Sequence, residues 1–210
     1  FLKTLGLLDR TPFEIVEATG STPLVPQKWG KLSSVTISYG HGISNTPMHL
    51  AAAYATIANG GHVVTPTVLK QQHVERGPRV MSAESAAAAR DMLRKVVTEG
   101  TASFGEVEGY LVGGKTGTAD KPKPRGGYYD DKVINTFASM FPSDNPKYVL
   151  IVTLDEPVET SGTKPRRTAG WTAVPVAATI IERVAPLLGM KPRETHVEPL
   201  AATGVTLTSN

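Results

Sequence analysis

Gly113-Gly114-Lys115-Thr116-Gly117-Thr118-Ala119 is the stretch that decides how this chain is interpreted, and Leu111-Val112 lead into it as the start of a strand. Glycine inside a strand marks a bulge or a place where a ligand approaches the backbone closely. A lysine flanked by threonine hydroxyls and bare backbone N–H groups can receive a carboxylate or a developing oxyanion. Because Lys-Thr-Gly is only three residues long, the surrounding chain has to support this interpretation.

The composition of the 210-residue chain is that of an ordinary globular protein, with 40% hydrophobic and 20% charged residues. Its net charge of +3, from 22 basic and 19 acidic residues, is too small and too evenly spread to indicate nucleic-acid binding. The sequence contains no cysteine, which excludes disulfides and thiolate metal sites. No apolar run approaches the roughly 18 residues of a membrane span. Residues 1–8 have the pattern of the last turns of a helix, so we expect that residue 1 is not the start of the gene product.

The rest of the chain is predicted to contain helices and one group of strands. Helices are expected at residues 47–59, 83–98 and 171–188, where apolar residues recur at helical spacing, and Thr46 and Ser82 stand at capping positions. Strands are expected at residues 110–119, 133–141 and 148–155, with one or two short ones within 62–70. We expect a long connection at residues 9–34, a polar loop at 120–132 and an extension or flexible tail at 189–210. The turn formers of residues 142–146 predict an antiparallel hairpin, and the fold class is α+β.

Two short matches to serine acyltransferase motifs are predicted to be accidental. These enzymes place a nucleophilic serine one helical turn before a lysine, and Ser161-Gly162-Thr163-Lys164 has that spacing. Gly162 and Pro165 disfavour a helix there, however. Ser143-Asp144-Asn145 matches a second motif, S-D-N, but it occupies the predicted hairpin turn, where these residue types are common.

Other stretches of the chain give Lys115 a specific context. They are Ser38-Tyr39-Gly40-His41-Gly42, Thr46-Pro47, the helix ending Tyr54-Ala55-Thr56-Ile57-Ala58-Asn59-Gly60-Gly61, Asn135 to Pro142, and Val149 to Pro157. Together, and in this order, they resemble the class B penicillin-binding proteins, most closely the septal cell-division branch. The resemblance implies the α+β transpeptidase fold shared with serine β-lactamases. Residues 1–188 would form the C-terminal portion of that domain, and residues 189–210 would be a C-terminal extension.

The resemblance also implies roles for individual residues of the strand. Lys115 would assist electrostatically and in proton transfer, and the hydroxyls of Thr116 and Thr118 would hold the carboxylate of a substrate or β-lactam. The backbone N–H of Thr118 would form half of an oxyanion hole. Gly114 and Gly117 would belong to the binding strand, with Gly117 allowing the acyl donor to lie against it. The loop at 120–132, through Tyr128 and Tyr129, would rim the cleft.

The implied activity is that of a peptidoglycan D,D-transpeptidase, which cross-links stem peptides through a serine acyl-enzyme and is a target of β-lactams. In this family the serine motif precedes the region matched here. We therefore expect the N-terminal half of the domain and a membrane anchor to lie outside this chain, and the chain alone to be inactive. The implied location is the periplasmic face of the cell membrane, with cell-division or elongation membrane proteins as partners. The alternatives are a serine β-lactamase or penicillin-sensing domain, and a non-catalytic fragment or pseudoenzyme that acts as a binding module.

No metal or organic cofactor is expected. His41 and His49 have no third ligand at a usable spacing, and His41 is expected to pack within its glycine-rich loop. The basic clusters at residues 121–125 and 164–167 are expected to be solvated loops. Attraction to anionic envelope polymers or lipid head groups is a weaker alternative for these clusters.

Overall fold

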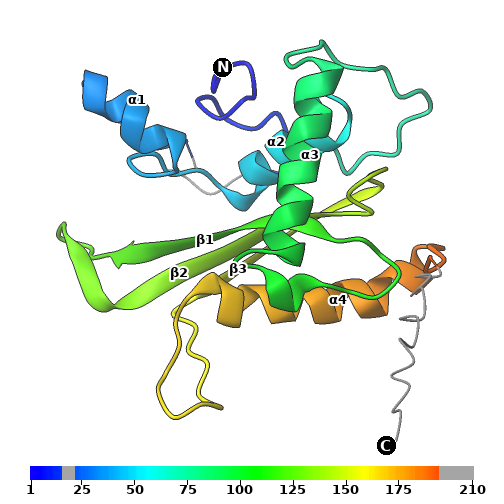
Figure 1. Ribbon diagram of the computed structural model, residues 1–210. Helices are drawn as coiled ribbons and strands as arrows, with labels where there is room; N and C mark the ends of the chain where they lie inside the picture. The colour runs from blue at the N-terminus through cyan, green and yellow to red at the C-terminus, as the bar shows by residue number, and fades with distance from the viewer. Residues whose placement is uncertain (16–21, 194–210) are drawn as a thin grey trace, which may run out of the picture.

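The computed structural model describes residues 1–15 and 22–193 of the chain (Figure 1). The helices are α1 (Lys31–Ser38), α2 (Pro47–Ala58), α3 (Ala83–Thr98) and α4 (Ala173–Leu187), with short 3-10 helices η1 (Ser103–Gly105) and η2 (Ala169–Trp171). The strands are β1 (Gly113–Pro122), β2 (Tyr128–Phe141) and β3 (Tyr148–Asp155). They form one antiparallel sheet in the order β1-β2-β3, which confirms the predicted α+β class and the hairpin at residues 142–146.

Helices cover both faces of the sheet. In Figure 1, α4 runs below the sheet, and α2 and α3 lie above it. The main core lies on the α4 side, where Phe137 of β2 is fully buried with Val174 and Ile181 of α4. Because side chains alternate along a strand, the buried Ala138 and Met140 of β2 point to the opposite face, toward α2 and α3.

Local sequence signals explain the helix boundaries. Ser82 accepts a hydrogen bond from the backbone N–H of Ser85 at 3.1 Å, as expected for the cap of α3. Thr46 caps α2, and Pro47 occupies its first turn, where a missing N–H costs nothing. The imidazole of the buried His49 completes this cap, because its Nδ1 lies 2.7 Å from Thr46 Oγ1 and its Nε2 lies 2.8 Å from the carbonyl oxygen of Asp9. His49 is therefore a structural residue.

Two predictions for the N-terminal part were wrong. Residues 1–8 form turns rather than a helix: Leu5 donates one helical-type bond to the carbonyl of Phe1, and Gly6 at φ 75° then reverses the chain. The predicted connection at 9–34 extends too far, since α1 begins at Lys31. Its sequence, KLSSVTIS, contains weak helix formers, so propensity gave no signal. Residues 16–21 of that connection lie outside the described residues.

Two predictions about strands also need correction. Residues 62–70 form no regular strand, only an isolated bridge between His62 and Arg79. The supposed loop at 120–132 consists mostly of strand, because β1 continues to Pro122 and β2 begins at Tyr128. A tight turn within residues 123–127 joins them, with the N–H of Lys123 bonded to the carbonyl of Gly127 at 2.9 Å. The sequence of this hairpin shows no alternation of apolar and polar residues, because both of its faces carry charged residues, so the strands were not predicted.

Residues 189–193 follow α4 and return to the body of the molecule. The backbone N–H of Arg193 donates to the carbonyl of Gly109 at 2.9 Å, and its guanidinium pairs with Asp144. The predicted tail beyond residue 193 lies outside the described residues. Within the described part of the chain, no helix is long and apolar enough to cross a membrane.

Candidate active site

The candidate site is built on β1, which is an edge strand of the described sheet. It pairs with β2 from Gly113 opposite Met140 to Thr118 opposite Asn135 and beyond. Among the described strands only β2 bonds to β1, so one backbone edge of β1 is open to an added strand. Alternation places Thr116 and Thr118 on the face that carries η1, η2 and α4, and Lys115 on the other face.

The two glycines of β1 have different roles. A Cβ at Gly114 would lie 2.6 Å from the carbonyl oxygen of Ala138 and 2.7 Å from the ring of Phe137. Packing against the core therefore requires glycine at position 114. A Cβ at Gly117 would have no neighbour closer than 3.8 Å, and Gly117 is exposed. Within the described residues, nothing about packing explains Gly117.

Lys115 and Thr116 lie together at the exposed edge. The Lys115 ammonium donates to the carbonyl oxygen of Thr116 at 2.8 Å and to its hydroxyl at 3.4 Å. The Thr116 hydroxyl also lies 2.8 Å from the hydroxyl of Thr101, which follows α3. The structure thus joins a strand hydroxyl to a cation on one side and to a second hydroxyl on the other.

Thr118 is held from a third segment of the chain. Its Oγ1 accepts the backbone N–H of Ala169, in η2, at 3.0 Å. The turn that presents Ala169 is fixed by the fully buried Asn135 on β2. The Asn135 Nδ2 donates to the carbonyl of Arg167 at 2.7 Å and to Thr172 Oγ1 at 2.6 Å. Since Arg167 O can only accept, these bonds also determine the orientation of the amide.

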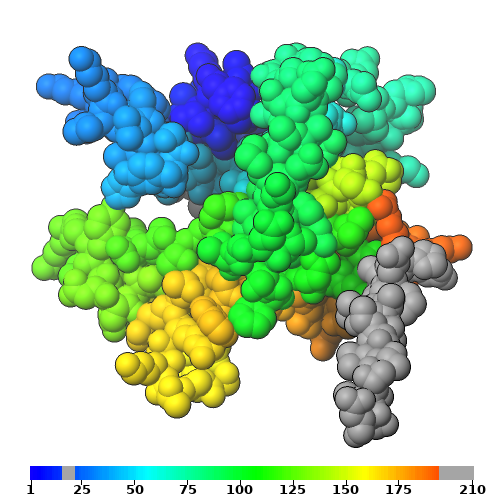
Figure 2. Space-filling view, viewed as in Figure 1, coloured from blue at the N-terminus to red at the C-terminus, as the bar shows by residue number. Residues whose placement is uncertain are grey.

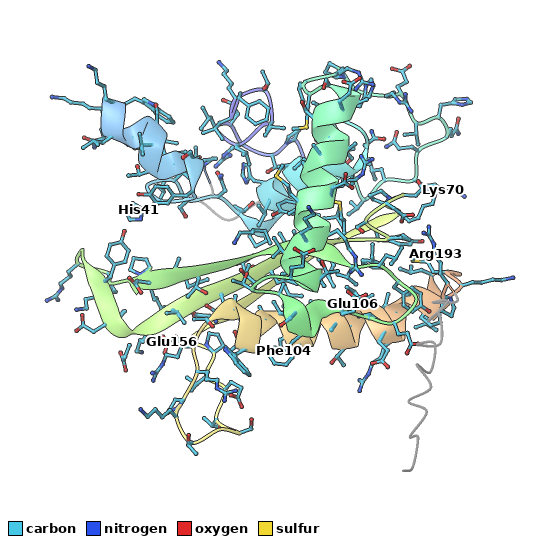
Figure 3. The ribbon with its side chains drawn as sticks, viewed as in Figure 1. His41, Lys70, Phe104, Glu106, Glu156 and Arg193 are labelled. Carbon is cyan, nitrogen blue, oxygen red and sulfur yellow. The ribbon has the colours of Figure 1, made fainter. Side chains whose placement is uncertain are left out.

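A cavity of about 430 Å³ opens beside these hydroxyls. It is lined by the strand residues Thr116 and Thr118, by Gly100, Thr101, Ser103 and Phe104, and by residues 168–171. Two exposed aromatic rings, Phe104 and Trp171, form one wall with their centroids 4.9 Å apart. The guanidinium of Arg166 stacks on the ring of Trp171, 3.7 Å from its centroid. Phe104 marks this wall on the α4 side of the sheet in Figure 3.

Sequence reasoning found the strand but missed what supports it. Thr101 and Ala169 come from segments that were interpreted only as the end of one helix and the approach to another. The preceding cluster, residues 164–167, was interpreted as a solvated loop, yet Arg166 stacks on Trp171 and exchanges two backbone hydrogen bonds with Glu159. No periodicity links such positions to β1. A weak signal was available in the paired glycine and hydroxyl residues Gly100-Thr101 and Thr168-Ala169-Gly170.

Tyr128 and Tyr129 lie at the start of β2, in the β1–β2 hairpin, and line no part of the 430 Å³ cavity. Tyr129 lies under two ammonium groups, those of Lys123 at 5.5 Å and Lys132 at 5.0 Å. Their predicted place on the rim of a substrate cleft stays a prediction.

An ionic cluster stabilises the base of this hairpin. Lys121 donates to Asp155 at 2.7 Å and to Glu156 at 2.8 Å, and Lys132 lies 2.9 Å from Glu156 (Figure 3 labels Glu156). Hydrogen bonds from these two ammonium groups, Lys121 first, hold the pKa of Glu156 below its ordinary value of 4.5. The hydrogen bonds that Lys121 donates to Asp155 and to Glu156 raise the pKa of Lys121 to about 12.

We expect the contribution of Glu156 to stability to be lost in acid. A carboxyl whose folded pKa is lowered stabilises the fold above its ordinary pKa, and this effect disappears as the pH falls through the lower folded value. Replacing Glu156 by glutamine should therefore lower the unfolding temperature at neutral pH, and the difference from wild type should vanish well below about pH 4.5. Thermal unfolding followed by circular dichroism at several pH values measures this difference. Glu182→Gln, on the exposed face of α4, is the matched control and should show no such convergence.

The two accidental motif matches have the predicted local structures. Residues 161–164 form successive bends, so Ser161 and Lys164 do not share a helical face. Ser161 instead donates its backbone N–H to the carboxylate of Glu159. Ser143 is buried in the β2–β3 turn, where its N–H donates to the carbonyl of Leu111 at 2.8 Å. The described residues contain no cluster of histidine, aspartate and glutamate that could hold a metal ion.

Comparison with known proteins identifies the family of the chain. Residues 1–182 match the family described as the penicillin binding protein transpeptidase domain. The chain belongs to this family. Two curated members with which the chain aligns over most of its length are a probable peptidoglycan D,D-transpeptidase FtsI of Caulobacter vibrioides and the stage V sporulation protein D of Bacillus subtilis. The identities are 35% and 34%, over 96% and 94% of this chain but only 35% and 32% of those relatives.

Solved transpeptidase structures show the same fold. The transpeptidase domain of Burkholderia pseudomallei penicillin-binding protein 3 superposes with a TM-score of 0.80 at 34% identity, over 92% of this chain and 58% of that one. Penicillin-binding protein 3 of Mycobacterium tuberculosis in complex with ampicillin superposes with a TM-score of 0.77 at 30% identity. The superposition covers 95% of this chain and 47% of that one. The chain thus spans about a third of the curated relatives and about half of these structures.

Proposed function

We propose that this chain is the C-terminal portion of a peptidoglycan D,D-transpeptidase domain, and that β1 is one wall of its active site. The observation that carries the proposal is an edge strand with Lys115 and two fixed threonine hydroxyls, in a chain of the transpeptidase family. An acyl donor would lie along the open edge of β1 as an added strand. Lys115 would supply positive charge, the hydroxyls of Thr116 and Thr118 would hold a carboxylate, and the N–H of Thr118 would face the developing oxyanion.

The nucleophilic serine of this proposal lies outside residues 1–210. A serine is activated by a lysine one helical turn away, and residues 161–164 do not provide that arrangement. The curated relatives also extend well beyond the matched region. Acylation would break the scissile amide of the donor peptide, or the lactam amide of the drug. The serine oxygen would form the ester, and the leaving amine would take up a proton.

The test is covalent labelling of the complete transpeptidase protein and of the 210-residue polypeptide with a fluorescent penicillin. Intact-mass spectrometry should show one adduct on the complete protein, mapped to a serine that precedes Phe1, and none on the 210-residue chain. An adduct on Ser161, or on another serine of this chain, would contradict the proposal. Rapid release of the adduct with hydrolysed drug would instead favour the β-lactamase alternative.

The exposed apolar residues of α1 are consistent with a surface that is covered by the remaining half of the transpeptidase domain. Leu32, Val35 and Tyr39 are 78%, 58% and 70% exposed, although they are apolar residues of a helix or its end. In the space-filling view, α1 and the β1–β2 hairpin project on the same side of the molecule with an open notch between them (Figure 2). The remaining half of the domain would cover this face of α1 and place the serine opposite β1.

The proposed substrates, inhibitors, location and partners follow from the type of enzyme. The substrates would be peptidoglycan stem peptides, with β-lactams as inhibitors, and the protein would work at the outer face of the cell membrane with other cell-division or elongation proteins. Ampicillin is bound by the Mycobacterium tuberculosis structure named above, which supports the assignment of β-lactams as ligands.

The two glycines of β1 provide a prediction with an internal control. Gly117→Ala should leave the free energy of unfolding within about 0.5 kcal/mol of wild type, because the new Cβ has room. It should nevertheless slow acylation of the complete domain about tenfold or more, since the methyl group displaces the acyl donor from the strand. Stopped-flow acylation and urea unfolding measure the two effects.

Gly114→Ala should behave in the opposite way. Its Cβ would overlap the Ala138 carbonyl and the Phe137 ring, so we expect about 1–3 kcal/mol of destabilisation from overpacking. If Gly117→Ala is acylated as fast as wild type, the acyl donor does not lie on this part of β1.

A further inference from the structure

The hydroxyls of Thr116 and Thr118 are each bonded to a group from a different segment of the chain. Thr101 Oγ1 lies 2.8 Å from Thr116 Oγ1, and the Ala169 N–H lies 3.0 Å from Thr118 Oγ1. The two segments also touch each other, because a Cβ at Gly170 would lie only 2.5 Å from the carbonyl oxygen of Thr101. Residues 101 and 169–170 therefore form one continuous support along the face of β1.

This support determines where the hydroxyl protons point. A hydroxyl carries one proton and two lone pairs. At Thr118 a lone pair is occupied by the Ala169 N–H, and within the described residues the hydroxyl donates to no acceptor. Its proton is thus available to the cavity that Thr118 lines.

The Thr101–Thr116 pair also leaves one hydroxyl proton available to the cavity, whichever of the two hydroxyls donates to the other. If Thr101 donates, the proton of Thr116 is available; if Thr116 donates, the proton of Thr101 is available. The Lys115 ammonium, 3.4 Å from Thr116 Oγ1, can only donate, so it occupies a lone pair and not the proton. All three threonines line the cavity.

We propose that Thr101 is a positioning residue for the carboxylate-binding hydroxyl of Thr116. It would act together with the Ala169 N–H, so that β1 meets an anionic group with two hydroxyl donors already oriented. A hydrogen bond to a charged acceptor is roughly twice as strong as a neutral one, and donors that are oriented in advance lose less entropy on binding. This inference rests on the proposed function, since it concerns the ligand of the same site.

The test uses two acyl donors on the complete domain: benzylpenicillin, which carries a carboxylate, and its methyl ester, in which that group is neutral and one methyl larger. Thr101→Val keeps the shape of the side chain but removes the hydroxyl. It should slow acylation by benzylpenicillin about three- to tenfold, the effect of one hydrogen bond, and leave the rate with the ester unchanged. Thr101→Ser should restore the wild-type rate with benzylpenicillin. Thr179→Val, on the exposed surface of α4, is the matched control and should change neither rate.

A double-mutant cycle gives a second, independent readout. In a Thr116→Val background, Thr101→Val should have no further effect, because the hydroxyl that it positions is gone. Equal slowing with both donors would show a merely structural role and overturn the inference, as would a wild-type rate of Thr101→Val with benzylpenicillin. Failure of the wild-type domain to react with either compound would overturn the proposed function itself.

Discussion

Replacing Lys115 by alanine should slow β-lactam acylation of the complete domain about 100-fold or more while leaving the fold intact. One preorganised electrostatic group at an acyl-transfer site is worth about 10²–10³ in rate, because it acts on charge that develops only in the transition state. Lys115 is exposed, and its ammonium contacts only Thr116 among the described residues. We therefore expect the free energy of unfolding to change by less than about 0.5 kcal/mol.

Lys121→Ala is the matched control for this experiment. It removes an ammonium from the same strand, but one that is already paired with Asp155 and Glu156 at the hairpin base. Acylation of this variant, measured by stopped flow with a fluorescent penicillin, should proceed at the wild-type rate. A Lys115→Ala protein that reacts as fast as wild type would show that β1 is not the wall of the active site.

Replacing Asn135 by aspartate should destabilise the fold by about 3–5 kcal/mol at neutral pH, as expected for an uncompensated buried charge. Asn135 is fully buried, and its Nδ2 provides two of the hydrogen bonds that hold the turn before α4. A carboxylate would face the carbonyl of Arg167, which has no proton to offer. Burial would raise the pKa of the new carboxyl, so the loss should grow as the pH rises.

Urea unfolding at several pH values measures this loss, with Asn145→Asp as the control. Asn145 has the same chemistry but lies exposed in the β2–β3 turn, so its replacement should cost less than about 0.5 kcal/mol. Equal effects at the two positions would mean that the amide of Asn135 does not support the turn.

The sequence alone predicted the parts of this molecule whose signals are local. The boundaries predicted for α3 and β3 agree with the structure, because helical periodicity with a serine cap, and a β-branched run after a turn, act over a few neighbouring residues. The secondary structure predicted from the sequence was wrong where local propensity conflicts with the folded structure. In α1 the helix propensity is low, and at residues 62–70 a β-branched stretch has only one bridging partner.

Lys115, Thr116, Gly117 and Thr118 were found as a motif because they are contiguous in the sequence, and their roles in a site stay a prediction. Tertiary structure alone decided which residues contact the hydroxyls of Thr116 and Thr118. The partner of Thr116 lies 15 residues away in sequence and that of Thr118 lies 51 away, and both arrive only when η1 and η2 pack against the sheet. Tertiary structure also gives the two glycines of β1 different surroundings. A Cβ at Gly114 would overlap the ring of Phe137, whereas a Cβ at Gly117 would have no neighbour closer than 3.8 Å. That difference arises from contacts across the sheet rather than from the order of residues along β1.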